Sequence, residues 1–457
     1  MIGSETIATG TARHFFPDSR LSGRKPGTQQ IRHRTGRESQ GKHRQDMDED
    51  IQKLQLAYGS QGSLQLELLT RQIQLHHRAP VAPADAQAAV HQAFEQPVDF
   101  PPFESAFVQD DLVVVVIDID TPQADLIFRE IWTRLKTLGF SAENLSLIQP
   151  AVWKQVNGVD PRAGMGAAEY QAFPLQRHDP TVQGNCSYLA STSSGERVYL
   201  SRLLTDADVV ITVGPAEFDP VLGVRGTASS LFPGLSDLEA LRKAQGQGHE
   251  ELGPRDVRPF RQMVDEIGWL LGLQLSVVTV PGVGAAAHEV LVGRTESVLQ
   301  RARQSLEENW MITIPQRVEL ALVTVPSDAA GQGWDQVAAA IDVGRRLVER
   351  NGRIVVLSEL DSLPGPGLEI LKSVREPRDA MRPIQRANTP DLIAASRIAA
   401  AADWANVSLL SKLDPEIVSD LFLVPLESEQ EALRLLQTED LMAIVESAQH
   451  AFVISGT

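Results

Sequence analysis

Short apolar runs alternate with helix-forming segments along most of the chain, and this alternation limits the fold more than any other feature. The clearest run, LVVVVI at residues 112–117, is apolar throughout and is typical of a strand buried on both faces. Beyond about residue 275, strand and helix candidates follow one another regularly to the end of the chain. This pattern predicts an α/β fold with parallel or mixed sheets that helices cover on both faces.

The individual elements are expected where the apolar period and the flanking turn residues change. A β-hairpin is expected at residues 54–69, because LQLAYGSQGSLQLELL alternates around a Gly-Ser turn. Ser428 and Glu431 have the spacing of a capping box and predict a helix start. Further strands are expected at residues 112–117, 145–150, 196–204, 207–214, 273–282, 318–325, 352–360, 406–411, 421–426 and 450–455, and helices at 84–95, 121–138, 257–272, 334–350, 367–374, 390–402 and 428–436.

The chain is expected to fall into three parts. Residues 1–46 hold nine Lys/Arg and four Asp/Glu without an apolar period, so we expect a disordered basic tail, with Met47 a candidate for the natural start. Residues 47–275 are expected to form an N-terminal α/β domain. Residues 276–457 are expected to form a C-terminal α/β domain, whose last helix and strand could pack back on the first domain.

Composition argues against several classes of protein. The net charge of −17 disfavours a nucleic-acid partner, because the phosphate backbone is also negative. The longest apolar runs are strand-sized, so no membrane span is expected. Cys186 is the only cysteine, which excludes internal disulfides and cysteine metal clusters and fits a reducing, cytoplasmic location. Beyond the tail, no histidines have the spacing of a zinc motif, so no metal site is expected.

Polar residues follow the apolar run at 112–117, and ligands of α/β sheets bind at the carboxyl ends of strands. Asp118 and Asp120 could hold a cation or orient a substrate hydroxyl. Thr121 and Pro122 have the pattern of a helix cap followed by proline at the first helical position. Capping would account for Asp120 but not for Asp118, so both interpretations stay open.

Two other groups of residues suggest chemistry in loops. His178 and Asp179 are neighbours and suit acid–base work, although adjacent side chains in a loop usually diverge. Glu217 and Asp219 lead into the stretch GVRGTASSLFPG at 223–234, whose backbone N–H groups could cradle an anion. This stretch has no lysine, and the acidic residues in front of it would compete with a bound anion.

A third loop has the pattern Gly282-x-Gly284-x-x-Ala287 after an expected strand and before a helix, which is similar to a dinucleotide fingerprint. The acidic residue that should end the next strand is not at the expected spacing, because that strand ends near Val325. The loop therefore supports a nucleotide-dependent oxidoreductase only as an alternative.

The order of these pieces resembles the LarA-like family of lactate racemases, which interconvert the enantiomers of 2-hydroxy acids with a nickel-pincer nucleotide. The resemblance begins near Leu54 and extends to the end of the chain. It implies two α/β domains with mixed or parallel sheets and an interdomain cleft for cofactor and substrate. It rests, in the family's order, on the LAYG hairpin, AVHQAFEQPVDFPPFESAF, Asp118-x-x-x-Pro122, HDP, ADVVITVG and GxxG…PG.

The resemblance also assigns the cofactor positions of the family to residues of this chain. The loop keeps Gly223 and Gly226, but Ser229 stands where the family has the lysine that anchors the cofactor covalently. Gln245 stands where the family has its nickel-binding histidine, and His249 is only a weak metal candidate.

The positions that the family uses for its substrate are also changed. The two catalytic histidines fall on Trp153 and Asp219, and the arginine that clamps the substrate carboxylate falls on Thr121. In the second domain Gln336 matches a glutamine of the family pattern, whereas the lysine after it is Ala339. Together with the residues of the glycine-rich loop, these residues are expected to line the binding cleft.

Racemisation through hydride transfer needs a hydride acceptor and paired bases. We therefore expect a lapsed or repurposed LarA-like protein without cofactor or metal, in which Asp118, His178 and Asp219 are the remaining candidates for catalysis. The alternative is an active 2-hydroxy-acid racemase or epimerase with rearranged ligands, which would use His178 or His249 and still need the nickel-pincer nucleotide.

Trp153 and Asp219 would leave the cleft narrower and more acidic than a hydroxy-acid anion prefers. We therefore expect a neutral or cationic small-molecule ligand. A homo-oligomer or a complex with an active paralogue is conceivable.

Overall fold

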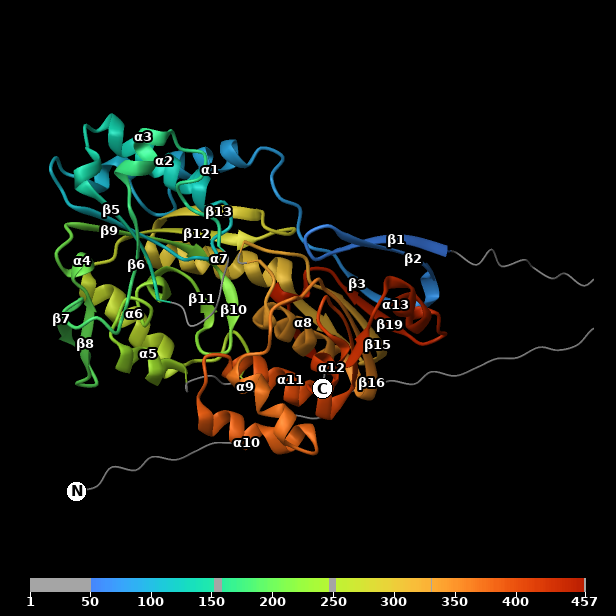
Figure 1. Cartoon of the computed structure of the whole chain (residues 1–457). Coiled ribbons are helices and arrows are strands. Elements are labelled where there is room, and N and C mark those ends of the chain that lie inside the picture. Colours follow the sequence, from blue (N-terminus) through green and yellow to red (C-terminus); the bar gives the residue numbers. More distant parts are fainter. Residues whose placement is uncertain (1–50, 152–157, 246–251, 330, 456–457) are drawn as a thin grey trace, which may run out of the picture. The chain divides into compact units, whose positions relative to one another are not determined.

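The computed structural model describes residues 51–151, 158–245, 252–329 and 331–455, all of which belong to one compact unit. The expected basic tail at residues 1–46 lies outside the described residues. The architecture is α/β, with two six-stranded sheets and helices packed against them (Figure 1). The fold class predicted from the alternation is therefore confirmed.

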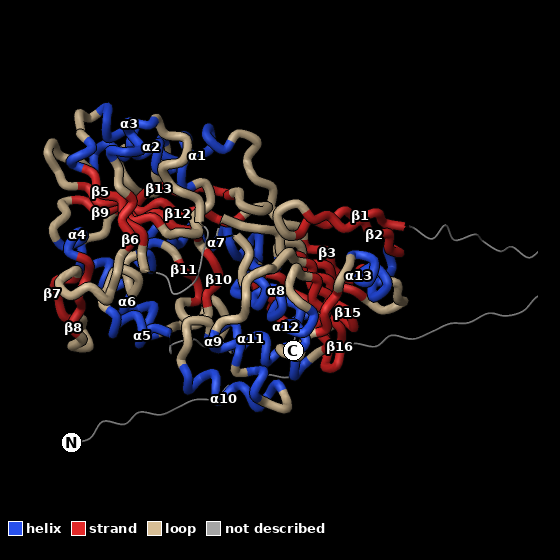
Figure 2. The backbone as a smooth tube through the Cα atoms, in the orientation of Figure 1, coloured by secondary structure: helices blue, strands red, loops and turns tan. Residues whose placement is uncertain are grey.

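The first sheet has the strand order β13-β12-β9-β4-β5-β6. Its labelled strands β5, β6, β9, β12 and β13 lie together in Figure 2. Its strands run parallel except at the edge, where β13 is antiparallel to β12, so this sheet is mixed. Its strands are β4 (Val113–Ile117), β5 (Leu145–Gln149), β6 (Leu175–Arg177), β9 (Val209–Pro215), β12 (Leu275–Pro281) and β13 (Ala287–Arg294).

Helices cover both faces of the first sheet because successive residues of its strands point to opposite sides. Val113, Val115 and Ile117 of β4 pack into one core with α1 (Ala86–Glu95) and α2 (Ala124–Thr137). Val114 and Val116 pack into a second core with α6 (Pro259–Leu271). The apolar run of β4 is explained by this double burial.

The second sheet has the order β18-β17-β16-β15-β19-β3, and all of its strand pairs are parallel. Ala321 and Val323 of β15 face a core shared with α8 and α11, whereas Leu320 and Leu322 face the β1–β2 hairpin and α13. The elements are β1 (Ile51–Tyr58), β2 (Gly62–Leu69), β3 (Ile73–His77), β15 (Val318–Thr324), β16 (Val348–Leu357), β17 (Asn406–Leu410), β18 (Val424–Leu426), β19 (Met442–Val445), α8 (Trp334–Leu347), α11 (Leu392–Trp404) and α13 (Glu429–Leu436).

The remaining elements are short or connect the two sheets. The helix α7 packs against β12 and β13, and the last strand, β20, pairs with β14. These elements are α3 (Ala167–Ala172), α4 (Arg202–Thr205), α5 (Leu238–Gln245), α7 (Thr295–Trp310), α9 (Pro366–Glu369), α10 (Pro377–Ala387), α12 (Pro415–Ser419), β7 (Cys186–Ser191), β8 (Arg197–Ser201), β10 (Glu217–Asp219), β11 (Gly223–Arg225), β14 (Met311–Ile314) and β20 (Phe452–Ser455).

The strands are not divided between the sheets at residue 275. The strand β12 begins at that residue and β13 follows it, but both belong to the first sheet, while β3 comes early in the chain and pairs with β19 of the second sheet. The ring of Phe452 in the last strand lies 5.5 Å from that of Phe218. The division into domains at 47–275 and 276–457 therefore stays a prediction, and the sheets themselves exchange segments across it.

The start of α2 differs from the sequence prediction. The helix begins at Ala124, and its cap is Gln123, which has a left-handed backbone with φ 58°. Thr121 is not the cap, because its hydroxyl donates to the carbonyl of Asp118 at 2.7 Å and closes a turn. By contrast, the helix start predicted at Ser428 is confirmed, since Ser428 Oγ accepts from Glu431 N. The second bond of a capping box is replaced, because Glu431 Oε2 accepts from Glu427 N at 2.9 Å instead of from Ser428 N.

Two other features of the described residues bear on the predictions. The helices α10 and α7 and the strand β13 occupy segments where no such elements are expected from the sequence. Among the helices of the described part, none has both the length and the apolar character that crossing a membrane would need.

Candidate functional site

The carboxyl ends of β4 and β9 bring charged side chains of separate segments together. The two strands are parallel neighbours, so the turn after β4 and the segment after β9 meet at one edge of the first sheet. The turn carries Asp118 and Asp120, and β10 and β11 carry Glu217 and Arg225 as directly paired residues. The strand-end rule therefore locates both aspartates correctly.

Arg225 is the centre of a charge cluster at this edge. Its Nη2 lies 2.5 Å from Asp120 Oδ2 and 2.9 Å from Glu217 Oε2. Glu217 also lies 3.6 Å, through Oε1, from Nδ1 of His450. Although burial lowers the pKa of Arg225, the neighbouring carboxylates raise it well above its ordinary value, so the guanidinium stays charged.

Asp118 lies behind the ion pairs and accepts a hydrogen bond from Ser230 Oγ at 2.9 Å. Burial raises the pKa of Asp118 to about 7, with Asp120 and Glu217 adding to the shift and Arg225 opposing it. Near neutral pH this carboxyl can therefore hold or release a proton.

Gly214 at the end of β9 makes room for Asp118, because a Cβ atom at this position would lie 2.5 Å from Asp118 Oδ2 and 3.0 Å from Ser230 Oγ. We expect Gly214→Ala to lower the free energy of unfolding by about 1–3 kcal/mol, the usual cost of overpacking. Gly166→Ala is the matched control, since a Cβ there meets nothing within 4 Å, and its cost should stay below that of Gly214→Ala. Urea unfolding of both variants measures the difference, and equal costs would contradict the explanation.

A cavity of about 200 Å³ opens beside the charge cluster, and we call it the acidic cleft. It is lined by residues that follow strands of both sheets and by residues of α8 and α11. Gln336, Ala339 and His450 are among them. Its formal charge is −3 with His450 neutral. The charged residues are five carboxylates (Asp120, Glu217, Asp219, Asp328 and Asp335) and two guanidiniums (Arg225 and Arg397).

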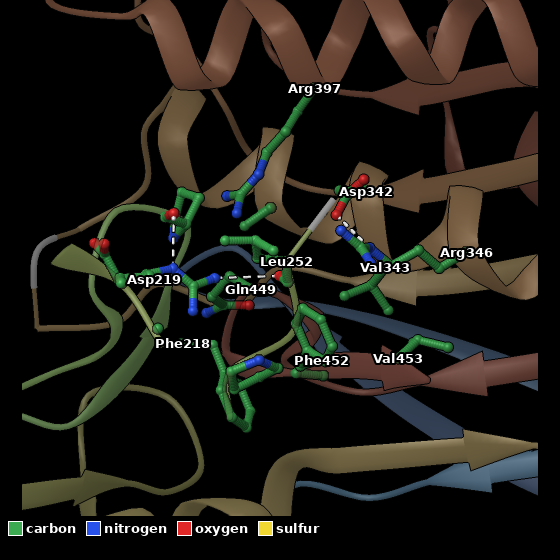
Figure 3. Close-up of a pocket in the computed structure, with 16 residues that line it drawn as sticks. Phe218, Asp219, Leu252, Asp342, Val343, Arg346, Arg397, Gln449, Phe452 and Val453 are labelled. Atoms are coloured by element: carbon green, nitrogen blue, oxygen red, sulfur yellow. Dashed lines mark hydrogen bonds and ion pairs between the residues drawn. The ribbon is translucent and has the colours of Figure 1, made fainter. Parts of the chain in front are cut away.

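A smaller cavity of about 40 Å³ adjoins the acidic cleft and shares Phe218, Asp219 and Arg397 with it (Figure 3). Arg397 points from α11 into this cavity in Figure 3. Burial would raise the pKa of Asp342, but Arg345, Arg346 and Arg397 outweigh it and lower the pKa to about 2. Asp342 therefore stays ionised and partly neutralises the basic side of the cavity.

The structure brings several sequence-predicted residues to these cavities. Asp219 and Gln336 line the acidic cleft, and Gly223 lines the smaller cavity. Asp219 also stabilises its own turn, because its Oδ1 accepts from the N–H groups of Val221 and Leu222 at 2.7 Å each.

Other predicted residues do not line the acidic cleft. Thr121 is buried and bonded to the backbone of Asp118. The hydroxyl of Ser229 accepts from Gly226 N at 2.8 Å and lies 3.2 Å from Gly226 O, so it closes a turn of its own loop.

His178 is not brought to the acidic cleft. It is buried, and its Nε2 lies 2.8 Å from the carbonyl of Ser236, which ties the β6 loop to the segment before α5. Asp179 accepts from the N–H and hydroxyl groups of Thr181 instead of facing the imidazole. The two side chains therefore have different hydrogen-bond partners, although the imidazole of His178 adds to the lowering of the pKa of Asp179 by the hydrogen bonds from Thr181.

Three of the predicted positions have no described side chain. Trp153 and His249 lie outside the described residues, and Gln245 is known only as the last residue of α5. Among the side chains that the structure does describe, no group of three or more His, Cys, Asp or Glu could hold a metal ion.

The loop with the glycine pattern lacks the structural context of a dinucleotide site. It joins the antiparallel strands β12 and β13, and Gly282 N donates to Ala286 O across it at 2.9 Å. A dinucleotide fingerprint leads from a strand into a helix whose N-terminus faces the pyrophosphate. The expectation of a helix after Ala287 is wrong, because β13 begins at this residue.

Arg225 and His450 are not among the residues predicted from the sequence. Arg225 is the only basic residue of the stretch at 223–234, a signal that was available beside the acidic residues in front of it. His450 follows β19, and the strand-end rule would have included it if the short run MAIV had been recognised as a strand.

Comparison with known proteins agrees with this architecture. A lactate racemase apoprotein from Thermoanaerobacterium thermosaccharolyticum is similar over 88% of this chain and 100% of its own, with a TM-score of 0.71 and 16% identity. A structural-genomics target from Thermotoga maritima is similar over 83% of this chain and 99% of its own, with a TM-score of 0.59 and 11% identity. At these identities the likeness establishes the fold.

The sequence itself provides the link to a family. No curated protein matches the chain. Residues 58–249, however, match the family described as the lactate racemase N-terminal domain, a range that includes the whole charge cluster except His450. Residues 58–249 are therefore similar to the lactate racemase N-terminal domain, and the chain as a whole shares the fold of the lactate racemase apoprotein.

Proposed function

We propose that this protein is a lapsed or repurposed member of the LarA-like lactate racemase family, which binds a small non-anionic molecule in the acidic cleft. It does not racemise 2-hydroxy acids by the nickel-pincer mechanism. We also propose a cytoplasmic location, which the single cysteine supports.

The observation that carries this proposal is the state of Ser229, the residue at the family's cofactor-anchoring position. A lysine amine can form a covalent link to a carbonyl or acyl group, whereas the Ser229 hydroxyl is held by the backbone of Gly226. Thr121 and Asp219, at two substrate positions of the family, are engaged in turns in the same way. Each of these three replacements thus has a structural role.

The residues that the structure describes do not fit the nickel-pincer nucleotide. The described side chains include no cluster that could hold a metal, and the cleft is lined by five carboxylates that would repel a nucleotide phosphate. Arg225 could counter this charge, but it already pairs with Asp120 and Glu217. We therefore derive no catalytic step through this cofactor.

The same charges disfavour the family's substrate class. A 2-hydroxy acid is an anion at neutral pH, and its carboxylate would enter a cleft of formal charge −3. His178, which an active enzyme with rearranged ligands would use, is bonded to Ser236 away from the cleft. A neutral or cationic ligand fits this electrostatic environment better.

The decisive experiment is a racemisation assay on protein purified from a host that makes the cofactor. We expect no conversion of D- or L-lactate by chiral chromatography, no stoichiometric nickel by elemental analysis, and no covalent adduct by intact-protein mass spectrometry. A lactate racemase produced in the same host serves as the positive control. Interconversion of the lactate isomers that stops when nickel is chelated would refute the proposal.

A further inference from the structure

The geometry points to His450 as the residue that selects the ligand of the acidic cleft, and we propose that this ligand is a small primary ammonium compound. The inference deepens the proposed function and rests on it. It assigns a chemical class to the ligand and a binding role to a residue outside the matched family domain.

His450 is a buried side chain with an unused polar atom. It is 6% exposed and lines the acidic cleft. Its Nδ1 lies 3.6 Å from Glu217 Oε1, while its Nε2 is buried and has no hydrogen-bond partner among the described residues. A buried nitrogen without a partner is energetically unfavourable, so a ligand that bonds it would recover this loss.

The neighbour of Nδ1 determines what Nε2 can bind. A carboxylate accepts hydrogen bonds only, so the favourable tautomer has its proton on Nδ1, facing Glu217. Nε2 then carries a lone pair and accepts. The complementary ligand atom must therefore donate a hydrogen bond, as an ammonium or hydroxyl group does.

The charge of the acidic cleft distinguishes between these two donors. Five carboxylates and two guanidiniums leave a formal charge of −3, which attracts a cation and adds nothing for a neutral hydroxyl. An inorganic cation is a poorer candidate, because the described carboxylates and imidazoles do not gather into a group that could hold a metal ion. An ammonium group satisfies both the acceptor and the charge.

The rest of the acidic cleft limits the size and shape of the ligand. Phe218, Pro281 and Ile393 supply apolar wall, which suits a short hydrocarbon chain behind the ammonium. The volume of about 200 Å³ is below the roughly 300–1,000 Å³ of pockets for drug-sized ligands. These dimensions favour an amine with only a few carbon atoms.

Four probe molecules of similar size separate the contributions of charge and of hydrogen-bond donors to binding. n-Butylammonium has charge and N–H donors, tetramethylammonium has charge alone, 1-butanol has a donor alone, and butyrate has the opposite charge. In calorimetric titrations of the full chain at neutral pH, we expect n-butylammonium to bind at least tenfold more tightly than each of the others. Equal binding of tetramethylammonium, tighter binding of butyrate, or no binding of n-butylammonium would overturn the proposal.

The chain offers a matched pair of histidines as a second test. His77 and His450 contact the same ring, that of Trp310, with ring centroids 5.6 and 5.3 Å away, and both have a buried Nε2 without a described partner. Only His450 lines the acidic cleft. We expect His450→Phe to weaken n-butylammonium binding about tenfold or more, while His77→Phe leaves it unchanged.

His450→Gln keeps an acceptor on the side chain and should recover part of the affinity that His450→Phe loses. Thermal unfolding of all three variants checks that they are folded. Unchanged binding by His450→Phe, or equal losses in both phenylalanine variants, would overturn the role of His450. The lactate assay tests the proposed function separately, because racemisation can be absent whether or not an ammonium binds.

Discussion

Replacing Arg225 by methionine is expected to lower the free energy of unfolding by about 3–5 kcal/mol, the usual cost of removing one partner from a buried ion pair. Arg225 Nη2 contacts Asp120 and Glu217 at 2.5 and 2.9 Å, and the side chain is 20% exposed. Without the guanidinium, these carboxylates and Asp118 would face each other in a poorly solvated space. Methionine fills similar volume but cannot compensate their charge.

Arg255→Met is the matched control for this experiment. Arg255 Nη2 also lies 2.5 Å from a carboxylate oxygen, that of Glu307, but its side chain is 70% exposed. Solvent screens exposed ion pairs, so they contribute little to stability, and this variant should unfold almost like the parent. Urea unfolding of both variants under the same conditions measures the difference in free energy. Similar losses of stability would show that burial does not determine how much the ion pairs of Arg225 stabilise the protein.

A triple variant separates the contribution of charge to the free energy of unfolding from that of packing. Adding Asp120→Asn and Glu217→Gln to Arg225→Met removes two of the three carboxylate charges that the guanidinium compensates. We expect this combination to recover part of the lost stability, because fewer buried charges then lack a partner. A triple variant less stable than Arg225→Met would indicate that packing and hydrogen bonds dominate.

The fold could be predicted where the local sequence determines the environment of a strand or helix. The valines of β4 are apolar at every position because alternate residues enter two different cores, and this pattern is visible in the sequence. The pairing of β3 with β19 could not be predicted, because residues 73–77 and 442–445 are brought together only by the tertiary structure. The domain boundary expected at residue 275 does not follow the sheets for the same reason, because pairing between distant segments cannot be predicted from the local sequence.

As with the fold, the residues of the candidate site could be predicted only where the strand before them is recognisable from the local sequence. Asp118 and Asp120 could be identified because they follow an obvious strand. The loop of Gly282 resembled a nucleotide site because the polar segment of β13 was not recognised as a strand, although antiparallel edge strands commonly carry polar residues on one face. His450 was missed because its strand, β19, is only four residues long and is recognised by its neighbours in the sheet.

The charge cluster also predicts a pH dependence of stability that runs opposite to that of most aspartates. Burial raises the pKa of Asp118 from 3.8 to about 7, against the opposing effect of Arg225, so the native state holds a proton there that the unfolded chain has released. Stability from this group is fully present below pH 3.8 and is lost as the pH rises through about 7. The slope approaches about 1.4 kcal/mol per pH unit between these values.

Asp118→Asn removes this titration while keeping an acceptor for Ser230 Oγ. The free energy of unfolding of the variant minus that of the parent should therefore increase by about 2–3 kcal/mol between pH 5 and pH 8. Asp160→Asn is the control, because Arg162 lowers the pKa of Asp160 to about 2, so its contribution should not change over this range. Urea unfolding at four pH values measures both differences. A constant difference for Asp118→Asn would mean that Asp118 is already ionised at pH 5 and that Arg225, rather than burial, controls its charge.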